Sequence, residues 1–175
     1  LDGRKNLIVK TFNLHIFAKH RHPLWIREIN VVIEKGAHDT QALVVGVITE
    51  AMNPGLDGLR AVIEKLAEPD VAIVSLTITE KGYCVDPATG MLDRENPMVV
   101  ADLNTPEQPQ SALGFIVQAL KLRRARRLAP FSVLSCDNIQ GNGHVAKAAI
   151  VDFARMLDAD LADWIEVEVR FPCTM

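Results

Sequence analysis

The chain has 175 residues, 49% of them hydrophobic, which is enough for one substantial buried core and favours a single domain. A formal net charge of −3 and a pI of about 6.0 give no general attraction to nucleic acid or to a membrane surface, so we expect neither as a partner. No apolar run reaches the roughly 20 residues of a membrane span, and the three cysteines lack C-x-x-C spacing. We therefore expect reduced thiols and a cytoplasmic location.

Short apolar segments between turn-forming residues organise the first half of the chain. Residues 1–30 show no clear period, and Pro23 argues against a helix through their middle. Val31–Ile33 and Ala42–Ile48 each predict a strand. Apolar residues then recur at helical spacing between Leu59 and Leu66, which predicts a helix.

Two more apolar segments predict strands of a parallel sheet that are buried on both faces: Val71–Thr77 and Phe131–Cys136. Ser111 is suited to cap a helix that runs to Arg127, and Asn142 to cap one that runs to about Met156. A last short helix is expected over Asp160–Glu168. Strands that alternate with helices predict an α/β fold with a mostly parallel sheet flanked by helices.

The predicted sheet contains Ala42–Ile48, Val71–Leu76 and Phe131–Ser135, with the last two strands parallel. Right-handed crossovers would place the loops that follow these two strands at one edge of the sheet. The segment Asp86–Gln110 is rich in Pro, Asn, Asp and Gly, and it predicts a long surface excursion of the kind that often has a function.

Polar side chains follow both of these strands, at the edge where open α/β sheets bind ligands. Glu80 is suited to relay a proton or to bind a sugar hydroxyl, although a solvated loop carboxylate fits the same pattern. Asn138 could donate to a carbonyl oxygen that gains charge in a transition state, or it could cap its own turn. Asp137 and Asn142 are expected to serve turn and cap geometry.

Three other features are expected to carry no chemistry. The basic cluster of Lys121, Arg123, Arg124, Arg126 and Arg127 ends a predicted helix, where cations complement the helix dipole, and it lacks the interleaved aromatics of a nucleic-acid site. The pair His20 and His22 has no third ligand at a suitable spacing, so no metal site is predicted. Neither G-x-G-x-x-G nor G-x-x-x-x-G-K-[ST] occurs in the sequence, so no pyrophosphate-binding turn is present.

Four strings in order along the chain resemble the polyol-specific long-chain dehydrogenases, the mannitol dehydrogenase family. They are IVSLTITEKGYCVDPATGMLD (73–93), SALGFIVQALKLRR (111–124), FSVLSCDNIQGNGHVAKAA (131–149) and LADWIEVEVRFPCTM (161–175). The TEKGYC and FPCTM strings are most similar to the branch of fructuronate reductases, also called D-mannonate oxidoreductases. The resemblance implies an unmatched segment at residues 1–30 and an incomplete Rossmann-like domain at residues 31–175, as the amino-terminal part of a longer protein with a helical second domain.

This resemblance also implies a reaction. Members transfer a hydride between NAD and a keto-sugar acid or ketose, of the fructuronate/mannonate or mannitol type. By the family motifs, Asn138 would polarise the reacting carbonyl and Glu80 would relay a proton. Thr77, Thr79 and Lys81 would lie near the nicotinamide ribose.

The sequence departs from the family in two respects. Residues 1–30 contain no counterpart of the glycine-rich pyrophosphate turn, and the family's catalytic lysine belongs to the second domain. We therefore expect the chain alone to be inactive and to bind NAD weakly or not at all, because that turn supplies backbone donors to the diphosphate. We also expect self-association through the surface that would meet the second domain. The alternative is a catalytically silent α/β fragment or binding module.

Overall fold

A computed structural model describes residues 9–12, 30–35, 40–45, 52–86 and 88–175. The strands are β1 (Val9–Phe12), β2 (Asn30–Lys35), β3 (Thr40–Val45), β4 (Ile73–Leu76) and β5 (Ser132–Ser135). The helices are α1 (Pro54–Asp57), α2 (Leu59–Leu66), α3 (Thr79–Gly82), α4 (Pro97–Asn104), α5 (Ala112–Ala125), α6 (Asn142–Leu157) and α7 (Ala159–Glu168). No helix in these ranges is long and apolar enough to cross a membrane.

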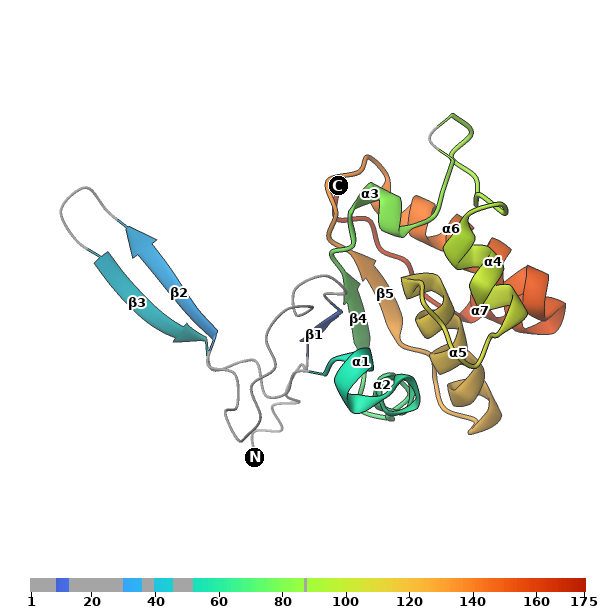
Figure 1. Cartoon of the computed structure of the whole chain (residues 1–175), viewed down its shortest axis with the longest axis horizontal. Coiled ribbons are helices and arrows are strands. Elements are labelled where there is room, and N and C mark those ends of the chain that lie inside the picture. Colours follow the sequence, from blue (N-terminus) through green and yellow to red (C-terminus); the bar gives the residue numbers. More distant parts are fainter. Residues whose placement is uncertain (1–8, 13–29, 36–39, 46–51, 87) are drawn as a thin grey trace.

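Three strands form a parallel sheet in the order β1-β4-β5 (Figure 1). The register sets Phe12, Leu76 and Ser135 side by side, so all three strands end at the same edge. This confirms the α/β fold with a parallel sheet and the parallel pairing of the strands at 73–76 and 132–135. Strand β1 was not predicted, because residues 1–30 show no periodic pattern.

The predicted place of the Ala42–Ile48 strand in this sheet was wrong. Strand β3 instead pairs antiparallel with β2, with Val31 opposite Val44 and Ile33 opposite Ala42. The connection between Lys35 and Thr40 is short, and two strands joined this way form a hairpin, whereas parallel neighbours need a crossover of about a dozen residues or more. Residues 46–48 of the predicted strand lie outside the described residues.

Helix α5 lies at the centre of the core. It packs against α2 and α6, and α6 in turn packs against β5 and α7. Leu113, Phe115 and Leu120 of α5 are fully or almost fully buried, as are Phe131 and Phe153. Residues 73–76 of β4 are buried or half-buried at every position, as predicted for a strand covered on both faces, whereas β5 alternates between buried and half-buried.

Arg123 from the basic cluster is a buried structural residue with only 3% of its surface exposed. Its Nε donates to the Ala129 carbonyl at 2.7 Å, and its Nη1 donates to the carbonyls of Glu68 at 2.8 Å and Val71 at 2.9 Å. The guanidinium also lies over the Phe131 ring, 5.4 Å from its centre. Burial lowers the pKa of Arg123. The structural interpretation of the basic cluster is thus confirmed for Arg123.

The start of α6 differs from the prediction. Gly141, at a left-handed φ of 64°, occupies the N-cap position, and Asn142 is the first helical residue. Asn142 does not cap, because its side chain bonds to other parts of the chain, as described below. The predicted capping role of Ser111 is confirmed, since its hydroxyl accepts from the Gly114 N–H at 3.0 Å at the start of α5.

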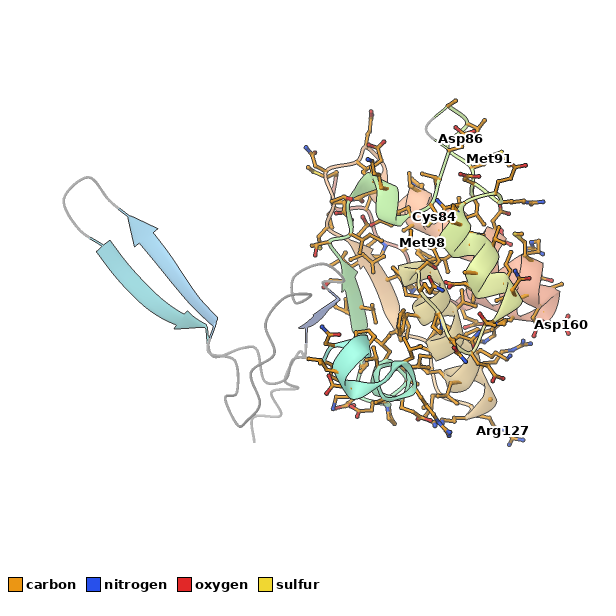
Figure 2. All side chains as sticks on the ribbon, in the orientation of Figure 1. Cys84, Asp86, Met91, Met98, Arg127 and Asp160 are labelled. Carbon is orange, nitrogen blue, oxygen red and sulfur yellow. The ribbon has the colours of Figure 1, made fainter. Side chains whose placement is uncertain are left out.

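The excursion at residues 86–110 is folded rather than irregular. It contains α4, whose Asp102 is fully buried and accepts from the N–H groups of Gln110 (2.6 Å) and Ser111 (3.0 Å) and from the Ser111 hydroxyl (2.6 Å). A buried carboxylate thus closes the excursion onto the start of α5. Figure 2 shows Asp86 and Met91 on this excursion, at the opposite end of the helical body from Arg127.

Candidate active site

The polar loops that follow β4 and β5 lie together at one edge of the sheet. The Cys136 N–H donates to the Leu76 carbonyl at 2.8 Å, so the pairing of the two strands continues to the point where both loops begin. Helix α3, which carries Glu80, follows on one side, and the turn with Asn138 follows on the other. The predicted meeting of these two loops at one sheet edge is confirmed.

Asp137 joins the two loops directly. Its Oδ1 accepts from the Thr79 N–H at 2.9 Å, and its Oδ2 accepts from the Ile78 N–H at 3.2 Å. These bonds connect residues 58 and 59 positions apart in the sequence. The Asp137 carboxylate therefore does more than serve its own turn, the role that was expected of it.

The same carboxylate accepts a third hydrogen bond from the buried Tyr83. The Tyr83 hydroxyl lies 2.8 Å from Asp137 Oδ2 and 2.6 Å from Ser135 Oγ. A carboxylate only accepts, so the phenol donates its single proton to Asp137 and accepts from the Ser135 hydroxyl. Burial raises the pKa of Tyr83, and the neighbouring Asp137 raises it further, because both disfavour a phenolate there.

The backbone at the start of α3 is strained. Thr79 has a left-handed φ of 63°, which a β-branched residue adopts rarely and at a cost of about 1–3 kcal/mol. Its N–H bond to Asp137 opposes that cost. At the end of α3, a Cβ on Gly82 would lie 2.7 Å from Ile78 Cβ, so only glycine fits this tight turn. Strain of this kind is concentrated at functional sites.

The five predicted site residues all present exposed side chains: Thr77, Thr79, Glu80, Lys81 and Asn138. Within the described part of the chain, no hydrogen bond or ion pair engages these side chains. The turn that Asn138 was alternatively expected to cap is closed by backbone, with the Ile139 N–H donating to the Asp137 carbonyl at 2.8 Å. Hydroxyl, carboxylate, ammonium and amide groups are thus available to a ligand at this edge.

A second network fixes the C-terminal residues beside β5. The Asn142 side chain, 1% exposed, donates to the carbonyls of Ser135 (3.1 Å) and Asp137 (3.0 Å) and accepts from the Thr174 N–H (3.1 Å). The Thr174 hydroxyl donates to the Ser135 carbonyl at 2.8 Å. A Cβ on Gly143 would lie 2.6 Å from the Phe171 carbonyl oxygen, so a glycine is required where this segment crosses α6. The segment therefore ends near the Asn138 turn.

Sequence reasoning missed Tyr83, Ser135 and Thr174 as parts of these networks. Tyr83 is the only tyrosine of the chain and directly follows Gly82, and Ser135 is a hydroxyl inside an otherwise apolar strand. A polar side chain at a buried position needs a partner, so these two positions carried a usable signal. Nothing local marked Thr174. Among the described residues, no group of three or more His, Cys, Asp or Glu could hold a metal ion, and His20 and His22 lie outside them.

Comparison with known proteins agrees with this arrangement. The profile of the mannitol dehydrogenase Rossmann domain matches residues 18–175. The chain belongs to this mannitol dehydrogenase family. The match begins before residue 31, where the resemblance of the sequence motifs was expected to start.

Relatives within the mannitol dehydrogenase family are oxidoreductases. An uncharacterized oxidoreductase (YeiQ) of Escherichia coli is 58% identical, and D-mannonate oxidoreductase of the same organism is 51% identical, each over 82% of this chain and 30% of the relative. The solved structure of Pseudomonas fluorescens mannitol 2-dehydrogenase, a ternary complex with NAD and D-mannitol, superposes with a TM-score of 0.76 at 42% identity. The aligned region covers 81% of this chain and 29% of the mannitol 2-dehydrogenase chain. The chain thus spans about 30% of the length of these relatives.

Proposed function

We propose that this chain is the coenzyme-binding part of an NAD-dependent oxidoreductase that transfers a hydride between the nicotinamide and a keto-sugar acid or ketose. The observation that carries the proposal is the shared sheet edge, where Asp137 joins the Glu80 loop to the Asn138 loop in a mannitol dehydrogenase Rossmann domain. The described edge is rich in groups that bind and polarise a small polar molecule.

The groups at this edge fit the nicotinamide end of NAD. Thr77, Thr79 and Lys81 expose two hydroxyls and an ammonium just beyond β4, and these groups suit a ribose and its phosphate. When bound, NAD would supply or accept the hydride. The chain would supply the binding groups at the strand end, which is where open α/β sheets hold dinucleotides.

In this proposal Asn138 stabilises charge on the substrate. Addition of a hydride turns a neutral carbonyl into an alkoxide, and an amide N–H at the strand end can donate to the oxygen as its charge grows. Glu80 is exposed at the same edge and can pass a proton between that oxygen and solvent. The Asp137 bonds hold its short helix α3 next to the Asn138 turn, which places both groups at the same end of the sheet.

The names of the relatives support the proposed substrate class. The D-mannonate oxidoreductase is 51% identical to this chain, and the mannitol 2-dehydrogenase that holds D-mannitol is 42% identical. A fructuronate/mannonate pair is therefore the first substrate to test, followed by fructose/mannitol. A cytoplasmic location and self-association of the chain remain predictions.

One observation favours a second candidate, a catalytically silent binding module. No turn of the G-x-G-x-x-G type occurs in the sequence, and such a turn usually supplies the backbone donors that hold the NAD diphosphate. Such a module would keep the polar edge and bind a sugar acid or nucleotide without reacting it.

Catalysis in a complete enzyme separates the candidates, because both allow weak binding of NADH, or none, by the 175-residue chain alone in calorimetry. A chimera of the E. coli D-mannonate oxidoreductase, with its matching segment replaced by the 144 aligned residues of this chain, tests catalysis. Fructuronate-dependent oxidation of NADH by the folded chimera supports the proposal. A folded chimera that binds NADH but turns over neither fructuronate nor fructose refutes it in favour of the silent module.

A further inference from the structure

We propose that Asp137 is a positioning residue that sets the distance and orientation between Glu80 and Asn138. The inference rests on the proposed function for its catalytic consequence, and on the hydrogen bonds of one carboxylate for its physical basis. Asp137 directly precedes Asn138 in the sequence, and it accepts from the N–H of Thr79, the residue directly before Glu80. The Asp137 side chain thus connects the residue that precedes Glu80 to the residue that precedes Asn138.

The carboxylate holds the Glu80 side through three donors. These are the N–H groups of Ile78 and Thr79, and the hydroxyl of Tyr83, which lies just past the end of α3. The same carboxylate therefore accepts hydrogen bonds from residues at the start of α3 and just past its end. Hydrogen bonds to an ionised acceptor are about twice as strong as neutral ones, so the carboxylate is better suited to this task than an amide.

The backbone of Asp137 holds the Asn138 side. Its carbonyl accepts from the Ile139 N–H at 2.8 Å and from the buried Asn142 side chain at 3.0 Å. Residue 137 is thus fixed to its own turn by its main chain and to the neighbouring loop by its side chain.

The strained backbone of Thr79 gives this link a further consequence. A left-handed φ of 63° at a threonine is maintained because Asp137 accepts the Thr79 N–H. When the carboxylate is removed, the residue can relax to an ordinary φ, which turns the start of α3 and carries Glu80 with it. Thr77 and Thr79 lie on the same segment, so the ribose-binding groups would move as well.

The first test uses the 175-residue chain and does not depend on catalysis. We expect Asp137→Ala to increase the hydrogen-exchange rates of the Ile78 and Thr79 amides by at least about tenfold, with Asp137→Asn intermediate because one acceptor oxygen remains. The pKa of Tyr83 should fall in both variants, because the neighbouring charge that raises it is gone. Asp86→Asn is the matched control, since among the described residues the Asp86 carboxylate accepts only from the nearby Ala88 N–H in an exposed turn.

The second test measures kinetics in the chimera described above. We expect Asp137→Ala to lower kcat by about 10²-fold, the usual cost of a misplacement near 1 Å, and to raise the KM for NADH. Asn138→Ala should lower kcat without raising that KM, because Asn138 meets the substrate rather than the cofactor. Asp86→Asn should change neither value. A rise in the NADH KM therefore separates a positioning residue from a residue that touches only the carbonyl.

The outcomes can be told apart from failure of the proposed function. Unchanged exchange at Ile78 and Thr79 in Asp137→Ala overturns the inference, as does altered exchange with unchanged kcat and KM in an active chimera. A folded chimera that binds NADH but is inactive refutes the proposed function, and the exchange rates in the chain alone then decide whether Asp137 positions α3. Global unfolding of Asp137→Ala, seen as loss of protection in α5 as well, would also overturn the inference, provided that Asp137→Asn unfolds too.

Discussion

Asn142 and Thr174 exchange two hydrogen bonds: Asn142 Nδ2 donates to Thr174 Oγ1 at 2.6 Å, and the Thr174 N–H donates to Asn142 Oδ1 at 3.1 Å. The pair joins the first turn of α6 to the segment that lies beside β5. Asn142 Nδ2 also lies within hydrogen-bond distance of the Ser135 and Asp137 carbonyls, so its two N–H groups are shared among three acceptors and connect α6, the end of β5 and the C-terminal segment.

The Asn142 network predicts a specific loss of stability. Asn142→Asp keeps the size of the side chain but removes both N–H donors and places a carboxylate against two carbonyl oxygens. We expect the free energy of unfolding in urea to fall by about 2–4 kcal/mol. Gln140→Glu, the same kind of amide-to-acid change at an exposed neighbouring position, should change it by less than about 0.5 kcal/mol. Equal effects of the two substitutions would show that the network contributes little.

The titration of Tyr83 gives a prediction with a clean readout, because this is the only tyrosine in the chain. Burial raises its folded-state pKa, whereas the unfolded chain ionises near pH 10. The folded state then holds a proton that the unfolded state loses. This contribution to stability is fully present below about pH 10 and is lost as the pH rises further towards the folded pKa.

Absorbance at 295 nm should therefore show no tyrosinate in the folded chain at pH 10.5, and a normal titration in guanidinium. The difference in unfolding free energy between the native chain and Tyr83→Phe should decrease above about pH 10, as the native phenol loses its advantage. A folded protein that titrates with the unfolded midpoint would contradict the buried hydrogen-bonded phenol.

Arg123 should be among the most sensitive positions of the helical body. Its guanidinium satisfies the carbonyls of Glu68, Val71 and Ala129, and a methionine of similar length would leave all three without this donor. We expect Arg123→Met to lower the free energy of unfolding by about 2–4 kcal/mol, and Arg123→Lys to recover only part of it, because an ammonium cannot reproduce the planar fork. Arg124→Met, at the exposed neighbour, is the control and should have a small effect. Urea denaturation measures all three variants.

The three cysteines should react in two classes. Cys136 and Cys173 are exposed, whereas Cys84 is buried, and burial raises the pKa of its thiol to about 11. Because the thiolate is the reactive form, a disulfide reagent at pH 8 should modify Cys136 and Cys173 rapidly and Cys84 only after unfolding. Mass spectrometry of the labelled peptides assigns the classes. Rapid labelling of Cys84 in the folded chain would mean that the end of α3 opens readily.

Local patterns were enough to predict the elements whose signal lies in neighbouring residues. Strands β4 and β5 stand out as apolar runs, and α5 begins at the cap that Ser111 supplies. The partner of β3 could not be found this way, because its apolar residues suit a parallel sheet and a hairpin equally well. Only the short connection to β2 decides between them.

The candidate site was also predictable only in part from the sequence. The order of the elements predicts that Glu80 and Asn138 follow the ends of two strands, and that these strand ends lie at the same edge of the sheet. The Asp137 bonds do not, because they join residues 58 and 59 positions apart and depend on the register of β4 against β5. No pattern in the sequence indicates that register. An aspartate that serves only its own turn therefore cannot be told from one that links two loops until the pairing of the strands is known.

The last prediction concerns the substrate-facing amide. Asn138 is exposed beside the Asp137 link, and in the proposed reaction it donates to an oxygen that changes from carbonyl to alkoxide. We expect Asn138→Ala in the chimera to lower kcat by about 10²–10³, the usual loss for one such donor. The KM for the sugar acid should change much less, since the bond strengthens mainly in the transition state. Asn138→Asp should be at least as slow, because a carboxylate repels the forming alkoxide. Gln140→Ala, two positions along the same turn, should keep full turnover. Unchanged kcat with a lower melting temperature in Asn138→Ala would instead assign Asn138 to the turn alone.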